Sequence, residues 1–216
     1  MSRIETARSK VRPAATVNLI GGRLCLDFVN TVGARRIGPS REMVIRDEKL
    51  NDYADVIAWA RHVGAFRESK IRALVKQALL QPRKAGRVLR KGLRLREALY
   101  GIFKAIVAGR KTRQADLVVL NEILEAARRA CQIGATGNGF EWQWRQSGVS
   151  LEQVLWKVGE SAGELLTMGD LSRLRQCGGG DCGWIFEDAT RNRSRHWCDT
   201  RDCGNRERVR RFRRSR

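Results

Sequence analysis

Four of the six cysteines in this 216-residue chain lie in its last forty residues, as two pairs with the same internal spacing. Cys177 and Cys182 form the first pair, Cys198 and Cys203 form the second, and fifteen residues separate the pairs. Such pairs are typical of a structural zinc site, because each turn presents two sulfurs and four sulfurs complete a tetrahedron. A segment this short cannot fold on its own core, so metal binding must supply on the order of 10–16 kcal/mol. The pattern therefore predicts one structural zinc ion.

Other uses of the four cysteines fit less well. An iron–sulfur cluster usually has tighter cysteine spacing. Disulfides need an oxidising compartment, whereas the N-terminus has no secretion signal and no apolar run approaches the ~18–20 residues of a membrane span, so we expect a cytoplasmic protein. Four thiolates also leave no open position for a catalytic water. His196, next to Cys198, could replace a ligand, but a stacked or solvent-facing ring is the favoured interpretation.

The residues around the cysteines predict a short β-hairpin. Gly178–Gly180 and Gly183 are expected to supply the positive φ values of a tight metal-binding turn. Trp184–Phe186 are expected to form one strand, with Trp197 on the return strand.

A basic helix is expected after the second pair, where seven of the eleven residues 206–216 are arginine. Asp202 is placed to cap this helix, and Val209 and Phe212 are expected to pack on Trp184 or Trp197. The predicted outward stripe is Arg206, Arg210 and Arg213.

The charge of the chain favours a polyanionic partner. It has 43 Lys and Arg against 23 Asp and Glu, a net charge of +20. Nucleic acid is the first candidate, since the arginine fork binds phosphates and guanine edges bidentately. A merely solvated basic surface explains the same composition. The residues expected to contact nucleic acid are Arg191, Arg193, Arg195, Arg206, Arg208, Arg210, Arg213 and Arg214.

The remainder of the chain predicts a mainly α fold with a small β-hairpin element. Residues 1–16 are predicted to be a disordered basic arm, residues 17–170 a mainly helical domain and residues 171–216 the zinc module. Apolar residues recur with helical periodicity, and Thr112 and a Ser150–Gln153 capping box are expected to begin two of the helices. The helices are expected near residues 52–63, 71–81, 84–108, 112–127 and 150–165.

Three segments between the helices have other patterns. Aromatic and polar residues alternate after Gly137–Gly139, a hairpin turn signal, so residues 131–146 are predicted to form a two-stranded ribbon. Residues 33–49 are predicted to be a mixed-charge loop that turns at Gly38-Pro39. Residues 24–28 alternate like a half-buried strand but also fit a short helix, and their type stays open.

A few polar and sulfur-containing residues remain. Asp27, Asn30 and Thr31 could line a small-molecule pocket, although a turn between two elements is favoured. Cys25 and Cys131 are expected to be buried as small hydrophobic residues. No glycine-rich phosphate loop follows a strand, so we do not expect an enzyme.

One run in the zinc module has a specific motif: Phe186-x-Asp188-x-x-x-Asn192-x-Ser194-Arg195-x-Trp197-Cys198, then Cys203-Gly204-Asn205-Arg206 and a basic tail. It resembles the CGNR zinc finger, with His196 where another arginine is expected. The GGRLCLDFVNT run at residues 21–31 and the LREAL run at residues 95–99 resemble the ABATE domain that precedes this finger in bacterial proteins. The resemblance covers nearly the whole chain and implies a DNA-binding transcription regulator.

We therefore expect a zinc-dependent DNA-binding protein. The helix after Cys203 would enter a groove, arginines 191, 193 and 195 would hold phosphates, and the helical domain would sense a signal or form a homodimer. RNA is the alternative partner, with Trp184 or Trp197 stacking on bases if exposed. A third interpretation is a protein-interaction module in which zinc only holds the tail.

Overall fold

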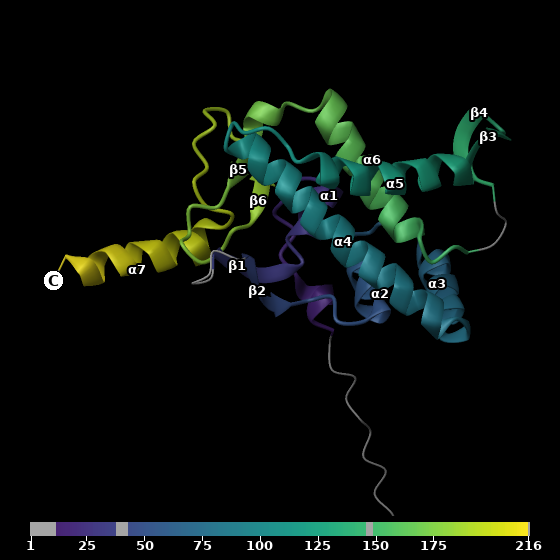
Figure 1. The fold of residues 1–216 in the computed structure, drawn as a ribbon, viewed down its shortest axis with the longest axis horizontal. Coiled ribbons are helices and arrows are strands. Elements are labelled where there is room, and N and C mark those ends of the chain that lie inside the picture. The colour runs from purple at the N-terminus through teal and green to yellow at the C-terminus, as the bar shows by residue number, and fades with distance from the viewer. Residues whose placement is uncertain (1–11, 38–42, 146–148, 216) are drawn as a thin grey trace, which may run out of the picture.

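A body of packed helices carries a small zinc-finger module at one end, from which the last helix projects (Figure 1). The computed structural model describes residues 12–37, 43–145 and 149–215. The prediction of a mainly helical fold followed by a small hairpin and a basic helix is confirmed. No helix within these ranges is both long and apolar enough to span a membrane. The helices of the body are α1 (Leu24–Val29), α2 (Tyr53–His62), α3 (Glu68–Leu80), α4 (Pro82–Val107), α5 (Gln114–Ala130) and α6 (Gln153–Met168).

Helix α4 is the central element of the core. It packs against α1, α2, α3, α5 and α6, and its predicted apolar stripe is fully buried at Leu95, Leu99, Ile102 and Phe103. Each such side chain contributes roughly 1.5–3 kcal/mol relative to an exposed one. The second predicted helix ends before Pro82 as expected, and this proline then begins α4, where its missing N–H costs nothing.

The segment of open type, residues 24–28, belongs to helix α1. Four of the six residues of this helix are buried, because it lies between α4, α6 and the zinc-finger module. Cys25 is among the buried residues, as predicted. Cys131 is only half-buried at the start of a strand, so the prediction for this residue is wrong.

Residues 33–49 are not the loop that was predicted. Strands β1 (Val32–Ile37) and β2 (Met43–Glu48) form an antiparallel hairpin, while the predicted turn at Gly38-Pro39 lies outside the described residues. The charged residues concealed the strands in the sequence, because two of them have partners on α4: Arg35 pairs with Glu97, and Glu48 pairs with Arg96.

The helix starts were predicted with mixed success. Asp52 caps α2 in a full capping box. The predicted cap at Thr112 is wrong, because α5 begins two residues later with Arg113 at its N-cap. The predicted capping box of Ser150 and Gln153 is also wrong, since the Ser150 hydroxyl accepts a hydrogen bond from the backbone of Glu152 and α6 starts after that residue.

Strands β3 (Cys131–Thr136) and β4 (Gly139–Trp144) form the predicted ribbon after α5, called the β3–β4 ribbon below. At the N-terminus, η1 (Pro13–Thr16) is a 3₁₀ turn that packs against α2 and buries Ala14. The disordered-arm prediction is therefore wrong for residues 13–16, because buried apolar contacts order them, and residues 1–11 lie outside the described part of the chain.

Candidate metal centre and nucleic-acid interface

The zinc-finger module pairs a strand before the first cysteine pair with a strand after it. After the 3₁₀ turn η2 (Leu171–Arg173), β5 (Leu174–Gln176) runs antiparallel to β6 (Ile185–Glu187). The predicted strand near residues 184–186 is thus present one residue later. The return strand through Trp197 is wrong, because residues 188–197 form a loop that is held by its own hydrogen bonds.

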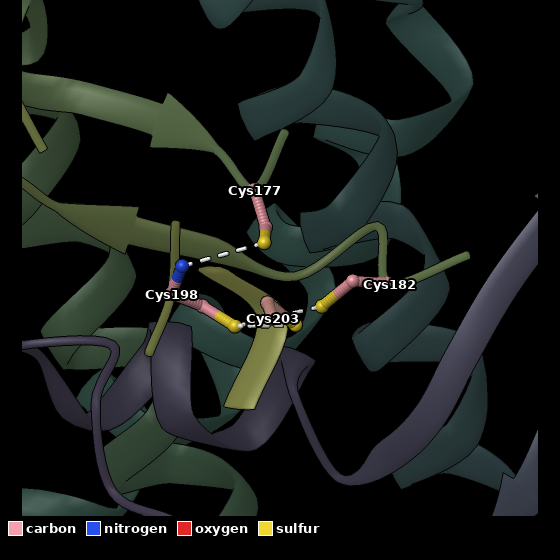
Figure 2. A group of neighbouring side chains, drawn as sticks. All are labelled: Cys177, Cys182, Cys198 and Cys203. Carbon is pink, nitrogen blue, oxygen red and sulfur yellow. Dashed lines mark hydrogen bonds between the residues drawn. The ribbon is translucent and has the colours of Figure 1, made fainter. Parts of the chain in front are cut away.

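The four cysteines lie together in one buried cluster (Figure 2). Their sulfurs all lie within 4.8 Å of one another. The Sγ atoms of Cys182 and Cys198 are 3.6 Å apart, and those of Cys198 and Cys203 are 3.5 Å apart. A tetrahedral Zn²⁺ with Zn–S bonds of about 2.3 Å requires sulfurs about 3.8 Å apart. The cluster therefore fits one structural zinc ion with all four positions filled by thiolate.

Hydrogen-bond donors surround this centre and offset its charge. Four thiolates and one Zn²⁺ carry a net charge of −2 (2 − 4). The backbone N–H groups of Gly179 and Cys198 lie 3.5 and 3.3 Å from Cys177 Sγ. Arg206 donates to Cys203 Sγ at 3.1 Å, and this hydrogen bond raises the pKa of Arg206. Donors of this kind orient the ligands and strengthen a metal site.

The glycines of the first cysteine pair serve close packing more than backbone strain. Only Gly183 has the predicted positive φ, at 72°. A Cβ on Gly178 would lie 3.3 Å from the His196 carbonyl oxygen, and one on Gly180 would lie 2.7 Å from the Arg210 guanidinium. His196 itself is exposed beside Trp197, which confirms the stacked or solvent-facing interpretation.

Asp188 organises the loop between β6 and the second cysteine pair. It accepts hydrogen bonds from the Thr190 hydroxyl at 2.6 Å and from the Thr190 and Arg195 backbone N–H groups at 2.9 Å each. Burial alone would raise the pKa of Asp188, but these hydrogen bonds hold it below its usual value. The Arg195 guanidinium stacks on Phe186 at 4.2 Å and donates to the Cys198 carbonyl oxygen. The aspartate and arginine of the motif therefore build the loop beside the metal.

The last helix, α7 (Asn205–Arg214), follows the π-helical turn η3 (Thr200–Gly204). Asp199 accepts hydrogen bonds from the backbone of Arg201 at 2.7 Å and Asp202 at 3.4 Å, so it caps this unit. The predicted cap at Asp202 is wrong because the wider turn begins earlier. Asp202 instead pairs with Arg206 on the surface.

The apolar residues of α7 do not pack as predicted. Val209 and Phe212 are 43% and 59% exposed. Trp184 is directed to the body, where its indole N–H donates to the Val32 carbonyl oxygen at 2.7 Å, and Trp197 packs on Gly204 at the start of the helix. Helix α7 therefore extends beyond the module, which Figure 1 shows at the far left.

The arginines predicted to contact nucleic acid fall into two groups. Those with protein partners are Arg193, with Asp170 and Ser172; Arg195, with backbone carbonyls; Arg206, with Asp202 and Cys203; and Arg210, with Asp181 and Glu207. Those that are exposed and form no ion pair with another described residue are Arg191, Arg208, Arg213 and Arg214. In the predicted outward stripe, Arg206 and Arg210 form ion pairs, whereas Arg213 forms none with another described residue. All three line one groove along α7.

Asn30 joins the body to the zinc-finger module. It is fully buried; its amide nitrogen donates to the Ile185 carbonyl oxygen at 2.8 Å, and its amide oxygen accepts from the Ile185 N–H at 3.1 Å. The Thr31 hydroxyl donates to the Phe28 carbonyl oxygen. Asp27 accepts from the Gly21 N–H at 2.8 Å, and burial raises its pKa to about 6. These contacts support the turn interpretation of the three residues over the pocket.

An ion network of two buried arginines and two partly exposed glutamates was not predicted from the sequence. Arg96 makes two bonds to Glu48, at 2.6 and 2.7 Å, and one to Glu97 at 2.8 Å. Glu97 also pairs with Arg35, which stacks on Tyr100 at 4.1 Å. The two charged residues of the LREAL run therefore connect α4 to the β1–β2 hairpin. The only signal in the sequence was their position within an otherwise apolar helical stripe.

A helical body joined to a four-cysteine zinc finger defines the class of this protein. The family model ABATE, described as "Putative stress-induced transcription regulator", matches residues 22–169. The CGNR zinc finger model matches residues 173–216. Since the first match covers more than half of the chain, the protein belongs to the ABATE family, and the resemblance seen in the sequence is confirmed. A search of curated proteins found no match.

Proposed function

We propose that this protein is a cytoplasmic, zinc-dependent DNA-binding transcription regulator, in which α7 enters a groove of the duplex and the helical body senses a signal or dimerises. The observation that carries the proposal is the projection of α7 from the module, with exposed arginines on its surface that form no ion pair with another described residue. A helix of this width fits the DNA major groove, and arginine binds both phosphates and guanine edges. The proposal assigns no catalytic step to the four-cysteine site.

The metal gives α7 its orientation in this proposal. Cys203, a ligand in the proposed zinc site, lies two residues before the first residue of α7, and Arg206 donates a hydrogen bond to its sulfur. Arg210 reaches back to Asp181 in the first cysteine loop at 3.2 Å. Because α7 otherwise packs mainly on the preceding turn, zinc and these two arginines fix the direction in which its outer residues point.

The arginines take different parts in the proposed complex. Arg208, Arg213 and Arg214 are the proposed direct contacts, because within the described ranges they have no ion pair to break before they meet DNA. Arg191 is a phosphate contact, and Arg193 becomes one when its exposed pair with Asp170 opens. Arg195 keeps a structural role, since its guanidinium bonds to backbone carbonyls next to the metal.

The alternatives have less support from the residues that they require. RNA binding by base stacking needs exposed aromatic rings, but Trp184 and Trp197 are half-buried against the body and the helix start. A protein-interaction module in which zinc only holds the tail makes no use of the unpaired arginines. Competition between matched DNA and RNA duplexes separates RNA binding from DNA binding. A protein-interaction module predicts instead that charge reversal of Arg210 and Arg213 leaves nucleic-acid binding unchanged.

Binding of fluorescent duplexes to the zinc-loaded protein tests the proposal. With about four phosphate contacts, affinity should fall roughly 10²-fold between 0.05 and 0.2 M salt, and a sequence preference should survive at the higher value. Replacing Arg213 and Arg214 by glutamate should weaken binding at least tenfold. The matched control replaces Arg83 and Lys84 by glutamate at the far end of α4, which makes the same change in net charge at two exposed residues outside the proposed interface.

Three results would count against the proposal. An equal loss of DNA affinity in the control and in the α7 variant would show that binding depends only on the net charge of the protein. Equal affinity for all duplexes at physiological salt would contradict sequence-specific recognition. Stronger binding to a matched RNA duplex would assign the interface to RNA.

A further inference from the structure

The β3–β4 ribbon separates its residues cleanly between two faces. Side chains alternate along a strand, and directly opposed residues lie on the same face. The register pairs Cys131 with Trp144, Ile133 with Trp142, and Ala135 with Phe140, so one face is wholly apolar. The other face carries Gln132, Gly134, Thr136, Glu141 and Gln143.

Within the part of the chain that the structure describes, only the base of the apolar face is covered. Trp144 packs against Trp156 of α6, with ring centroids 5.0 Å apart. Farther along, Ile133, Phe140 and Trp142 are 63%, 81% and 72% exposed. Single exposed apolar residues are normal on protein surfaces, but these three are neighbours on one face of a ribbon.

The ribbon presents this face in a defined position. The Arg145 backbone N–H donates to the Ala130 carbonyl oxygen at 2.7 Å, and its guanidinium donates to the Cys131 carbonyl oxygen at 2.9 Å, so the base of the hairpin is fixed. On the polar face the Gln143 side chain lies over Gly134, where a Cβ would come within 2.1 Å of it. A surface that is already ordered loses less entropy when a partner covers it.

Charge selects the partner for this face. The chain has a net charge of +20, yet residues 131–144 contain no Lys, Arg or His and a single acid, Glu141. Without a cation the ribbon cannot neutralise phosphates, and phosphate contacts supply most of the affinity for a nucleic acid. It is also a surface at which two copies of a strongly basic chain approach with little repulsion between neighbouring side chains.

We propose that the apolar faces of two β3–β4 ribbons pack together and join two copies of this chain into a two-fold dimer. A two-fold axis needs one self-complementary patch, and this face supplies it. From the 150–250 Å² that an aromatic side chain buries, the exposed residues provide roughly 400 Å² per copy. A total of about 800 Å² lies below the usual range of stable interfaces, so we expect a weak and reversible dimer. This inference names the surface for the dimerising role proposed above, and it does not depend on DNA binding.

Sedimentation velocity of the zinc-loaded, full-length protein without DNA tests this dimer. From about 1 to 200 μM protein, in about 0.3 M salt to screen the net charge, the wild type should shift from monomer to dimer. Trp142→Glu should weaken the association at least tenfold. Leu79→Glu is the matched control, because Leu79 on α3 is 78% exposed but lies outside the ribbon.

The outcomes separate clearly. A wild type that stays monomeric throughout, or a control that loses association as much as Trp142→Glu, overturns the proposal and leaves the face to a different partner. Thermal unfolding checks that each variant is folded. If Trp142→Glu does not fold, Phe140→Glu takes its place, since Phe140 is the most exposed of the three residues. Loss of self-association by that folded variant supports the proposal, and retention contradicts it.

Discussion

Two elements project from opposite ends of the longest dimension of this protein: α7 on one side and the β3–β4 ribbon on the other (Figure 1). Helix α7 is rich in arginine and owes its position to the four-cysteine centre at its start. The ribbon has one charged residue and is anchored by the Trp144–Trp156 contact and the end of α5. We therefore expect the polar element to depend on a metal, whereas the apolar one depends on packing and on hydrogen bonds at its base.

This difference predicts that the two ends can be disabled independently. Treatments that remove zinc should act on α7 and leave the ribbon in place, because the residues that anchor the ribbon belong to the core of the body. Changes on the ribbon should leave the metal centre and α7 unaffected. The variants below are ordered from the largest expected effect to the smallest.

Replacing Cys198 by serine should disable α7 completely. The site loses one of four thiolates, and a structural zinc contributes on the order of 10–16 kcal/mol to folding of its module. Metal analysis should fall from about one zinc per chain to none, and DNA affinity should fall by at least 10²-fold. Self-association through the ribbon should persist. Cys131→Ser, at the half-exposed cysteine outside the cluster, should keep its zinc; zinc retained by Cys198→Ser would contradict the assignment.

Replacing Asn30 by alanine should loosen the module from the body. The change leaves the buried N–H and carbonyl of Ile185 without these partners, which costs about 2–5 kcal/mol. Urea unfolding should show the loss, and a chelator should remove zinc faster. Gln176→Ala is the control. The Gln176 side chain donates a hydrogen bond to the Tyr100 hydroxyl that is only partly buried, and this bond should contribute about 1 kcal/mol. Equal losses of stability in the two variants would show that Asn30 is not the main contact between the module and the body.

Replacing Asp199 by alanine should fray the start of α7 with zinc still bound. Loss of this cap costs about 1 kcal/mol, so DNA affinity should fall a few-fold while ribbon association is unchanged. Asp202→Ala removes only an exposed pair with Arg206 and should change stability by about 0.5 kcal/mol or less. If Asp202→Ala lowered the thermal stability more than Asp199→Ala does, Asp202 would be the residue that caps α7.

The sequence predicted the features that follow from local pattern. Cysteine spacing identified the metal ligands, periodicity identified the long helices, and alternation after a glycine turn identified the ribbon. Local pattern could not identify β1 and β2, because their charged residues find partners on α4 that are 62 residues (Arg35–Glu97) and 48 residues (Glu48–Arg96) away in sequence. The direction of Arg195 was also unpredictable, since a long side chain turns toward whichever carbonyls and rings the folded loop brings near it. Sequence showed where the arginines are, and tertiary structure decides which of them are free.

The double hydrogen bond between Asn30 and Ile185 has a consequence for how such chains can be recombined. The two family matches meet between residues 169 and 173, but the packing surface of the finger includes backbone and side chains from residues 20–35. A finger transplanted alone would expose the fully buried Ile185 to water and leave its peptide groups without the amide that they contact. Functional chimeras must therefore exchange the segment around Asn30 together with the finger, although more than a hundred residues separate them in the sequence.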